Sequence, residues 1–254
     1  MRFGVIGYGR FGKLWAQLLR SFGHVLVSEI SCESGTQDEG LVFVTLREVV
    51  EVDLLFLLVP ISAMEDLCRD LEHIIGPKTI VVDACSVKCY PARVMKEYLP
   101  QGQEIIATHP LFGPDSVAKF GLEGRQIAVC PVSAKEKNVV FFNSMMKRMG
   151  LSVIETTPEE HDKQMARSQA LVHFIGRGLG PLELKDQEIA TPDYKTLLQM
   201  NAMVEHDTWE LFYDMQTYNP YAADMRQVFL KELGELETKI EARTHLKNNF
   251  EPGF

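Results

Sequence analysis

The sequence lacks several features that would assign it to common protein classes. No apolar run approaches the roughly 20 residues of a membrane-spanning helix. Its first residues predict a strand and no signal peptide, so the expected location is the cytoplasm. No CxxC spacing occurs among the five cysteines, which are Cys32, Cys68, Cys85, Cys89 and Cys130. We therefore predict reduced packing cysteines, with neither a disulfide framework nor a metal site.

Positive charge is also scarce. The 26 Lys and Arg residues face 35 Asp and Glu residues, which gives a net charge of -9. Such a surface repels nucleic-acid backbones and anionic membranes, so a small molecule is the expected partner. The 254 residues, 46% of them hydrophobic, are enough for a full core in one large domain or two smaller ones.

Short apolar runs alternate with segments of helical periodicity in residues 1–156. This alternation is typical of βαβ units and predicts an α/β domain with a parallel sheet. The expected strands are Arg2–Ile6, Val25–Ser28, Val42–Thr45, Leu54–Leu58, Thr79–Val82, Glu104–Ala107, Ile127–Cys130 and Ser152–Ile154.

Residues 157–254 show no strand pattern and predict an all-helical domain. The long periodic stretches are Glu160–Leu179, Tyr194–Tyr218 and Ala222–Asn248. Breaks between helices are expected at Pro181, Pro192 and Pro220, because proline removes a backbone donor and clashes inside a helix. The large apolar faces of such helices predict a homodimer.

A glycine-rich turn follows the first expected strand. It reads Gly7-Tyr8-Gly9-Arg10-Phe11-Gly12, and an amphipathic helix comes after it. In this pattern the first glycine makes the tight bend, the second lets the backbone approach a pyrophosphate, and the third allows close helix–strand packing. The turn therefore predicts a Rossmann-like dinucleotide-binding domain, in which Gly7, Gly9, Arg10, Phe11 and Gly12 contact a nicotinamide cofactor.

Glu29 ends the second expected strand, about 17 residues after the glycine turn. A carboxylate there accepts hydrogen bonds from the adenine ribose and repels a 2′-phosphate, which favours NAD over NADP. The other interpretation is a solvated carboxylate at a strand end. Leu58, Val59 and Pro60 close the fourth strand and are expected near the cofactor.

Two segments typical of site loops follow expected strands, at the edge where open α/β sheets bind ligands. They are residues 83–88, which contain Ser86, and residues 108–114, which contain His109. A histidine with an ordinary pKa of about 6.5 can act as a base near neutral pH. A loop histidine bonded to backbone is an equally good interpretation of His109.

Several motifs together are similar to the prephenate and arogenate dehydrogenase family. They are the serine loop, the sequence from His109 to Pro114 (His-Pro-Leu-Phe-Gly-Pro), His161-Asp162, and Ser168-Gln169-Ala170-Leu171-Val172-His173. The segment Ser168–Arg177 and residues 207–213 most resemble the plant-type arogenate branch. The resemblance implies hydride transfer from C4 of a cyclohexadienol to a nicotinamide, with loss of carbon dioxide. It also implies that His109 accepts the 4-hydroxyl proton and that Ser86 bonds the same hydroxyl and the nicotinamide region.

Substrate recognition is expected in the helical domain. Gln169, His173 and Arg177 follow one another at i, i+4 and i+8, which places them on one polar stripe. The stripe is either an ordinary solvated face or the wall of a cleft, in which Arg177 clamps a carboxylate and Gln169 or His173 bonds another. Many bacterial relatives carry a carboxylate-binding arginine before the position of Leu197, where this sequence has Tyr194-Lys195.

Asp207 bears on the choice between the two substrates. A carboxylate pairs with the α-ammonium of arogenate, whereas the keto oxygen of prephenate offers it only lone pairs. Plant-type arogenate enzymes resemble this chain in carrying an acidic residue there, so Asp207 points to arogenate. An exposed helix aspartate is the other interpretation, because Glu205, Glu210 and Asp214 lie nearby.

Two other classes of protein stay open. β-Hydroxyacid dehydrogenases and pyrroline-carboxylate or imine reductases also join a Rossmann domain to a helical one. A nucleotide-sensing protein without chemistry is the third possibility, because a fold does not fix a function. The combination of Ser86, His109 and His173 favours the dehydrogenase. The cofactor stays open as well, because plant-type relatives commonly use NADP.

Overall fold

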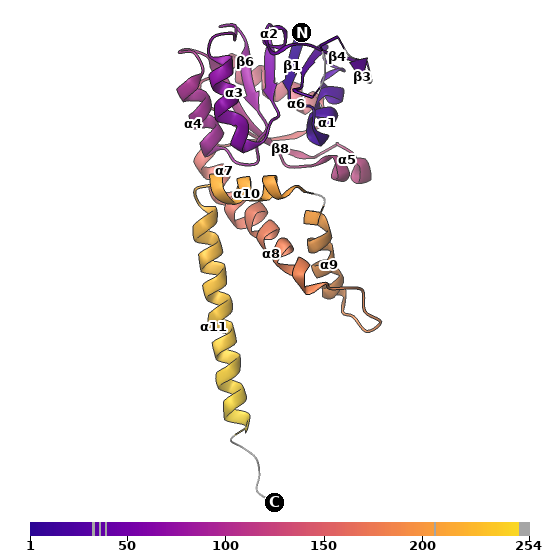
Figure 1. Cartoon of the computed structure of the whole chain (residues 1–254), viewed down its shortest axis with the longest axis vertical. Helices are drawn as coiled ribbons and strands as arrows, with labels where there is room; N and C mark the ends of the chain where they lie inside the picture. Colours follow the sequence, from indigo (N-terminus) through magenta and orange to yellow (C-terminus); the bar gives the residue numbers. More distant parts are fainter. Residues whose placement is uncertain (32–33, 36, 39, 206, 249–254) are drawn as a thin grey trace, which may run out of the picture.

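The computed structural model describes residues 1–31, 34–35, 37–38, 40–205 and 207–248 (Figure 1). The strands are β1 (Arg2–Ile6), β2 (His24–Ser28), β3 (Gln37–Asp38), β4 (Leu41–Phe43), β5 (Leu54–Leu57), β6 (Ile80–Asp83), β7 (Glu104–Pro110), β8 (Gln126–Pro131) and β9 (Ser152–Glu155). The α-helices are α1 (Arg10–Leu19), α2 (Leu46–Val49), α3 (Met64–Leu71), α4 (Cys89–Tyr98), α5 (Pro114–Phe120), α6 (Glu136–Arg148), α7 (Pro158–Met165), α8 (Leu171–Leu179), α9 (Pro192–Glu205), α10 (Trp209–Tyr218) and α11 (Ala222–Asn248). Short 3₁₀ turns are η1 (Ile61–Ala63) and η3 (Gly180–Leu182), and η2 (Ala166–Ala170) is a π-helical turn.

The strands form one sheet in the order β3-β4-β2-β1-β5-β6-β7-β8-β9. The pairs from β4 through β7 are parallel, as predicted, but β8 runs antiparallel to β7 and carries β9 with it. The expectation of an all-parallel sheet is therefore wrong at this edge. The connection of residues 111–125 contains only the short helix α5, whose seven residues span about 10 Å against the roughly 23 Å of β7, so no full-length crossover helix returns the chain for a parallel strand.

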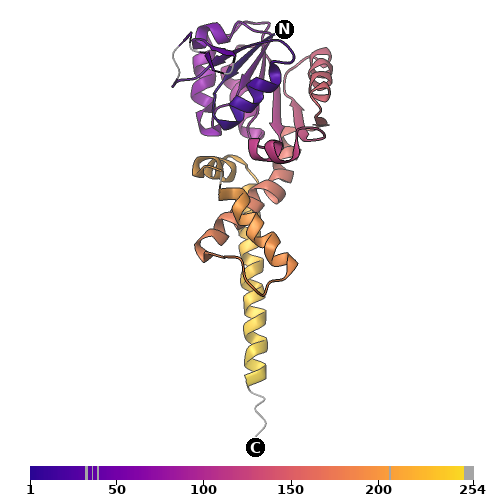
Figure 2. The same cartoon turned by 90° about the vertical axis from the view of Figure 1, so that its right-hand side faces the viewer.

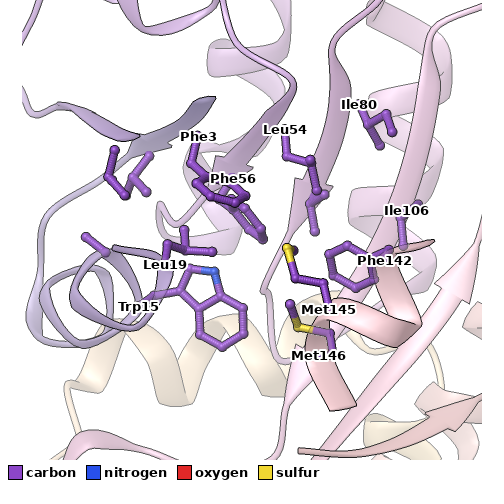
Figure 3. Close-up of a cluster of buried hydrophobic side chains, with 14 of the residues drawn as sticks. Phe3, Trp15, Leu19, Leu54, Phe56, Ile80, Ile106, Phe142, Met145 and Met146 are labelled. Atoms are coloured by element: carbon purple, nitrogen blue, oxygen red, sulfur yellow. The ribbon is translucent and has the colours of Figure 1, made fainter. Parts of the chain in front are cut away.

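Helices cover both faces of the sheet, and each face has its own apolar core. Trp15 of α1 and Phe142 of α6 pack beneath Phe3 and Phe56 of the sheet, all fully buried (Figure 3). Helices α2, α3 and α4 bury the second core on the opposite face. This layered α/β arrangement, followed by helices alone, confirms the predicted fold class.

The cysteines fit the predicted packing role where they are described. Cys68, Cys85 and Cys130 are buried, Cys89 is partly buried, and all four are free thiols. Cys32 lies outside the described residues.

Helix boundaries beyond Thr157 differ from the expectation in two places. The stretch Glu160–Leu179 contains the π turn η2 between α7 and α8. The stretch Tyr194–Tyr218 is two helices, α9 and α10, because Thr208 accepts a hydrogen bond from the Leu211 N–H and caps the start of α10. The three prolines lie at breaks between α-helices, as predicted: Pro181 follows α8, Pro192 begins α9 and Pro220 separates α10 from α11.

Helix α11 is the longest element and projects away from the sheet (Figures 1 and 2). It has 27 residues and contacts α8, α10 and η2, which belong to the helical part of the chain. No helix among the described residues is both long and apolar enough to cross a membrane.

Candidate active site

The glycine turn lies where β1 ends, against the chain that leaves β5. Gly7 has a φ of 98°, a conformation that residues with a side chain rarely adopt. A Cβ on Gly7 would lie 2.4 Å from the Leu58 carbonyl oxygen and 3.3 Å from the Val59 nitrogen. A Cβ on Gly12 would lie 2.2 Å from the Gly7 carbonyl oxygen. Two of the three glycines are thus required by close backbone approach, and Leu58 and Val59 lie beside the turn.

The remaining glycine leaves room for a ligand. Around the Cβ position of Gly9 there is open space within 4 Å among the described residues. Gly9 is also the N-cap of α1 and offers no side-chain oxygen to the first N–H groups of that helix. Free N–H groups at a helix start attract a phosphate, so this turn fits the pyrophosphate of a dinucleotide.

Arg10 and Phe11 contact the protein itself. The Arg10 guanidinium lies 2.6 Å from the Asp115 carboxylate of α5, and both side chains are exposed. The Phe11 ring stacks on Trp15 at 5.6 Å between centroids and also contacts Phe112. Both side chains therefore support the start of α1.

Glu29 turns toward the glycine turn. Its carboxylate accepts a 2.6 Å hydrogen bond from the Tyr8 backbone N–H, and the carboxylate is part-buried. Ser28, which precedes it, accepts a bond from the Gly7 N–H at 3.0 Å. The side chain is thus anchored beside the proposed nucleotide site, which disfavours the interpretation as a freely solvated strand-end carboxylate.

A buried ion pair links the end of β6 to the start of α4 and contacts β7. Lys88 and Asp83 have fully buried side chains in contact, and Lys88 also donates to the Thr108 carbonyl. Asp83 accepts from the backbone N–H groups of Cys85, at 2.9 Å, and Thr108, at 3.2 Å. This pair was not predicted from the sequence, although the charged residue Asp83 at the end of the apolar run Ile80–Val82 was an available signal. Ser86 lies half-buried in the same loop.

His109 lies within β7, paired with Ala128 of β8, and not in a loop as expected. The strand extends to Pro110 because β8 supplies it with a partner there. His109 is 3% exposed, and its Nδ1 lies 3.0 Å from Nε2 of His161 on α7. His161 Nδ1 in turn lies 2.8 Å from the Asp162 carboxylate. The two histidine motifs, separate in sequence, are thus one continuous chain of side chains.

Burial controls the charge of both histidines. Burial, then the neighbouring His161 and then the Lys88 ammonium hold the pKa of His109 well below its usual value. Burial also lowers the pKa of His161, against the opposing effect of Asp162. Both rings are therefore neutral near pH 7, and His109 has the charge state that a base requires.

A second polar cluster lies in the helical part. The Asp207 carboxylate lies 3.8 Å from His173 Nδ1, and the Asp207 carbonyl accepts a hydrogen bond from Arg177. The Arg177 guanidinium also lies over the Trp209 ring, 4.4 Å from its centroid. Burial, despite Asp207, lowers the pKa of His173, and Arg177 lowers it further. Three of the four expected substrate residues are therefore together.

Two expectations about this cluster need correction. Asp207 lies in the connection between α9 and α10 and not within a helix. Gln169 lies in the π turn η2, where the repeat is not 3.6 residues, so the regular i, i+4, i+8 stripe does not extend to it. Its side chain has no hydrogen-bond partner within the described part of the chain.

The helix that follows Asp207 contacts the sheet edge that carries the glycine turn. The Asp214 carboxylate of α10 accepts bonds from the Ser62 N–H and hydroxyl, both at 3.0 Å. Ser62 lies in η1, for which Pro60 is the N-cap. The expected cofactor segment Leu58-Val59-Pro60 therefore leads directly to the junction with the helical part.

Two protein-family models match the sequence. A model described as the nucleotide-binding domain of prephenate dehydrogenase matches residues 17–155, which is more than half of the chain. A second model, described as TYRAAT1-like, C-terminal domain, matches residues 178–251.

Similar proteins come from plants and archaea. Arogenate dehydrogenase 1, chloroplastic, of Arabidopsis thaliana is 28% identical over 96% of this chain and 40% of its own length. A probable arogenate/prephenate dehydrogenase of Methanocaldococcus jannaschii is 26% identical over 98% of this chain and 57% of its own length. The chain thus spans about half the length of these two relatives.

Solved structures share the fold. The prephenate dehydrogenase of A. aeolicus, solved with hydroxyphenyl propionate and NAD+, superposes with a TM-score of 0.75 at 18% identity. The match covers 96% of this chain and 92% of that one.

Proposed function

The chain belongs to the prephenate dehydrogenase family, and we propose on that basis that it oxidises and decarboxylates arogenate to tyrosine with a nicotinamide cofactor. The corresponding conversion of prephenate to 4-hydroxyphenylpyruvate is the alternative within the same chemistry. The observation that carries the proposal is His109, a buried neutral base in the strand next to the Ser86 loop. A nucleotide sensor has no use for such a base.

The glycine turn is the proposed cofactor site. Gly7, Gly9 and Gly12 shape the backbone around the pyrophosphate, and Glu29 accepts hydrogen bonds from the adenine ribose. Arg10 and Phe11 hold the start of α1, while Leu58, Val59 and Pro60 form the neighbouring wall. We propose NAD, because the Glu29 carboxylate repels the 2′-phosphate of NADP. When bound, the cofactor supplies the hydride acceptor.

His109 is the proposed general base. It accepts the proton of the substrate 4-hydroxyl as hydride leaves C4, so that a ring ketone forms without a charged oxygen. Loss of carbon dioxide from C1 then sends its bonding electrons through the ring to that oxygen, which takes the proton back from His109 as the ring aromatises. Ser86 is proposed to bond the same oxygen and fix its orientation.

The cluster of His173, Arg177 and Asp207 is the proposed substrate clamp. Arg177 is held by the Asp207 backbone carbonyl and by the Trp209 ring, which leaves the Asp207 carboxylate available for a ligand. That carboxylate is 33% exposed and suits the α-ammonium of arogenate. Arg177 and His173, with Gln169 nearby in the chain, are proposed to bond the substrate carboxylates.

A direct assay tests the function. The purified full chain is supplied with arogenate, prephenate or a generic β-hydroxyacid, each with NAD+ or NADP+, and reduced cofactor is followed by absorbance while products are separated by chromatography. We expect tyrosine and carbon dioxide from arogenate with NAD+. Turnover of the hydroxyacid alone would move the chain to another oxidoreductase class, and no turnover with any pair would overturn the proposal.

Replacing Asp207 tests the choice of substrate. Asp207→Asn removes a charged contact worth about 1.5–3 kcal/mol, so kcat/KM for arogenate should fall about 10- to 100-fold relative to prephenate. The exposed loop residue Asp186 provides the control Asp186→Asn, which should leave the ratio as it is. An unchanged ratio in Asp207→Asn would remove Asp207 from substrate selection.

We also propose a homodimer through the helical part. Helix α11 exposes Leu233, Leu236 and Ile240 at 46–53% of their surface, with the spacing of a coiled-coil seam. A second copy of the same helix is the partner that such a repeating seam fits best. The cytoplasm stays a prediction for the location of the protein.

A further inference from the structure

Asp162 is held at the start of a helix that belongs to the other part of the chain. Its two carboxylate oxygens accept the backbone N–H groups of Lys88, at 2.7 Å, and Cys89, at 2.8 Å. These are the N-cap and the first residue of α4. Both oxygens thus accept N–H groups at the positive end of the helix dipole, so Asp162 acts as an acceptor only.

This acceptor decides which nitrogen of His161 carries the proton. His161 Nδ1 faces the carboxylate at 2.8 Å and must therefore be the N–H donor. In a neutral imidazole the other nitrogen, Nε2, then bears the lone pair. Nε2 lies 3.0 Å from His109 Nδ1, which must donate to it.

The protonation of His109 Nδ1 also fixes the state of its other ring nitrogen, Nε2. With Nδ1 protonated and the ring neutral, Nε2 of His109 holds a lone pair. Among the described residues no group forms a hydrogen bond with that nitrogen. It is therefore the one position on the ring from which a substrate proton can be accepted.

We propose that His161 and Asp162 are positioning residues that hold His109 as its Nδ1–H tautomer, with Nε2 presented as the base. The role of His109 as a base rests on the proposed dehydrogenase function. The assignment of its tautomer rests only on the hydrogen bonds of Asp162, His161 and His109. The two residues also stabilise the protonated ring that forms during turnover, because His109 Nδ1–H then donates more strongly to His161. That gain opposes the nearby Lys88 ammonium, which disfavours the protonated ring.

Nuclear magnetic resonance reports the tautomer without any turnover. In the full chain labelled with ¹⁵N in its histidine rings, long-range ¹H–¹⁵N spectra distinguish a protonated from an unprotonated ring nitrogen. The His109 signals are assigned by their loss in His109→Asn. We expect protonated Nδ1 and unprotonated Nε2 at pH 7.5. The opposite tautomer would overturn the proposal, whether or not the chain turns over arogenate.

Two substitutions of His161 separate positioning from a general structural role. His161→Gln places an amide oxygen near the position of Nε2 and preserves an acceptor for His109. His161→Asn reaches only the Nδ1 position and leaves His109 Nδ1 without a partner. We expect kcat to fall about 100-fold in His161→Asn with KM little changed, and to recover by at least tenfold in His161→Gln. The control His73→Asn alters a histidine side chain that is 82% exposed and should match the parent.

The outcomes distinguish this inference from the proposed function. Equal activity of the Asn and Gln variants, with the His109 tautomer unchanged in both, would overturn the positioning role. Absence of turnover in the parent chain would overturn the proposed function, while the spectra would still decide the tautomer. If His161→Asn unfolds, Asp162→Asn provides the second variant, which weakens the acceptor and should produce a mixture of His109 tautomers.

Discussion

Several polar side chains at this site are fixed by backbone groups of neighbouring segments. Glu29 is held by the Tyr8 N–H, and Asp162 by the first N–H groups of α4. Arg177 is held by a carbonyl of the chain before α10. Backbone groups survive a substitution, so single replacements at these positions change chemistry more than architecture. His109 differs, because the partner of its ring is another side chain.

Replacing His109 should stop turnover and spare cofactor binding. His109→Asn is expected to lower kcat by about 10²- to 10⁴-fold, the usual contribution of a positioned base. Affinity for NAD+, measured by calorimetry, should be unchanged, because the glycine turn lies on β1, with β5 and β6 between it and β7. Loss of cofactor binding would assign His109 a structural role instead.

Replacing Glu29 should change the cofactor preference. Glu29→Gln keeps the shape of the side chain and weakens its hydrogen bonds to a ribose, so KM for NAD+ should rise about tenfold. Repulsion of a 2′-phosphate is also lost, and kcat/KM with NADP+ should rise relative to NAD+. Steady-state kinetics with both cofactors measure this, beside the exposed control Glu51→Gln. A constant preference would exclude Glu29 from cofactor selection.

From the sequence alone, a residue's role could be predicted only where it follows from the residues next to it in the chain. Gly7 and Gly12 follow from the spacing of the turn, and the close contacts of the structure require both. The roles of Lys88 and His161 could not be found this way. Each depends on a partner from a distant segment, Asp83 with Thr108 in one case and His109 in the other.

At the scale of elements, the apolar runs predicted each long strand to within a few residues. What they could not predict was direction, because alternation of side chains is the same in a parallel and an antiparallel strand. The reversed strand β8 extends β7 to Pro110 and so moves His109 from an expected loop into the sheet. The break between α9 and α10 was not predicted either, because the apolar periodicity continues across it. Only the N-cap residue Thr208 marks the start of α10.

The ion pair between β6 and α4 should carry much of the stability of this edge. Lys88→Met leaves Asp83 as a buried charge without its cation and should lower the free energy of unfolding by about 3–5 kcal/mol. The double variant Asp83→Asn/Lys88→Met should lose less, because no charge is left unpaired. Urea denaturation measures both, with Lys96→Met on the exposed side of α4 as the control. A single variant as stable as the parent would contradict the buried-pair argument.

At the scale of the whole molecule, α11 is the feature that a single chain does not explain. At 1.5 Å per residue its 27 residues extend about 40 Å, and the helix projects away from the sheet (Figure 2). Its seam residues Leu233, Leu236 and Ile240 are exposed. Exposed apolar surface of this extent is typical of an interface. The sequence predicted the length of this helix but not how little of the rest of the chain packs along it.

Leu236→Glu should separate the dimer. A carboxylate in the seam faces its copy across the two-fold axis, so light scattering after gel filtration should show a change from twice the 28.8 kDa chain mass to that mass. Thr238→Glu adds the same charge two residues away on the exposed surface of α11 and should leave the dimer intact. A parent chain that is already monomeric would refute the proposed assembly.

The contact between His161 and His109 also limits how this protein can be recombined. A chimaera that joined residues 1–156 to the helices of an unrelated reductase would keep the glycine turn, yet would lose the residues that orient the base. The same helices supply Asp162 to the start of α4, so the exchange would also leave that helix without its cap. The two parts are therefore not interchangeable modules, and a change in His161 is tolerable only where an acceptor for His109 Nδ1 is kept.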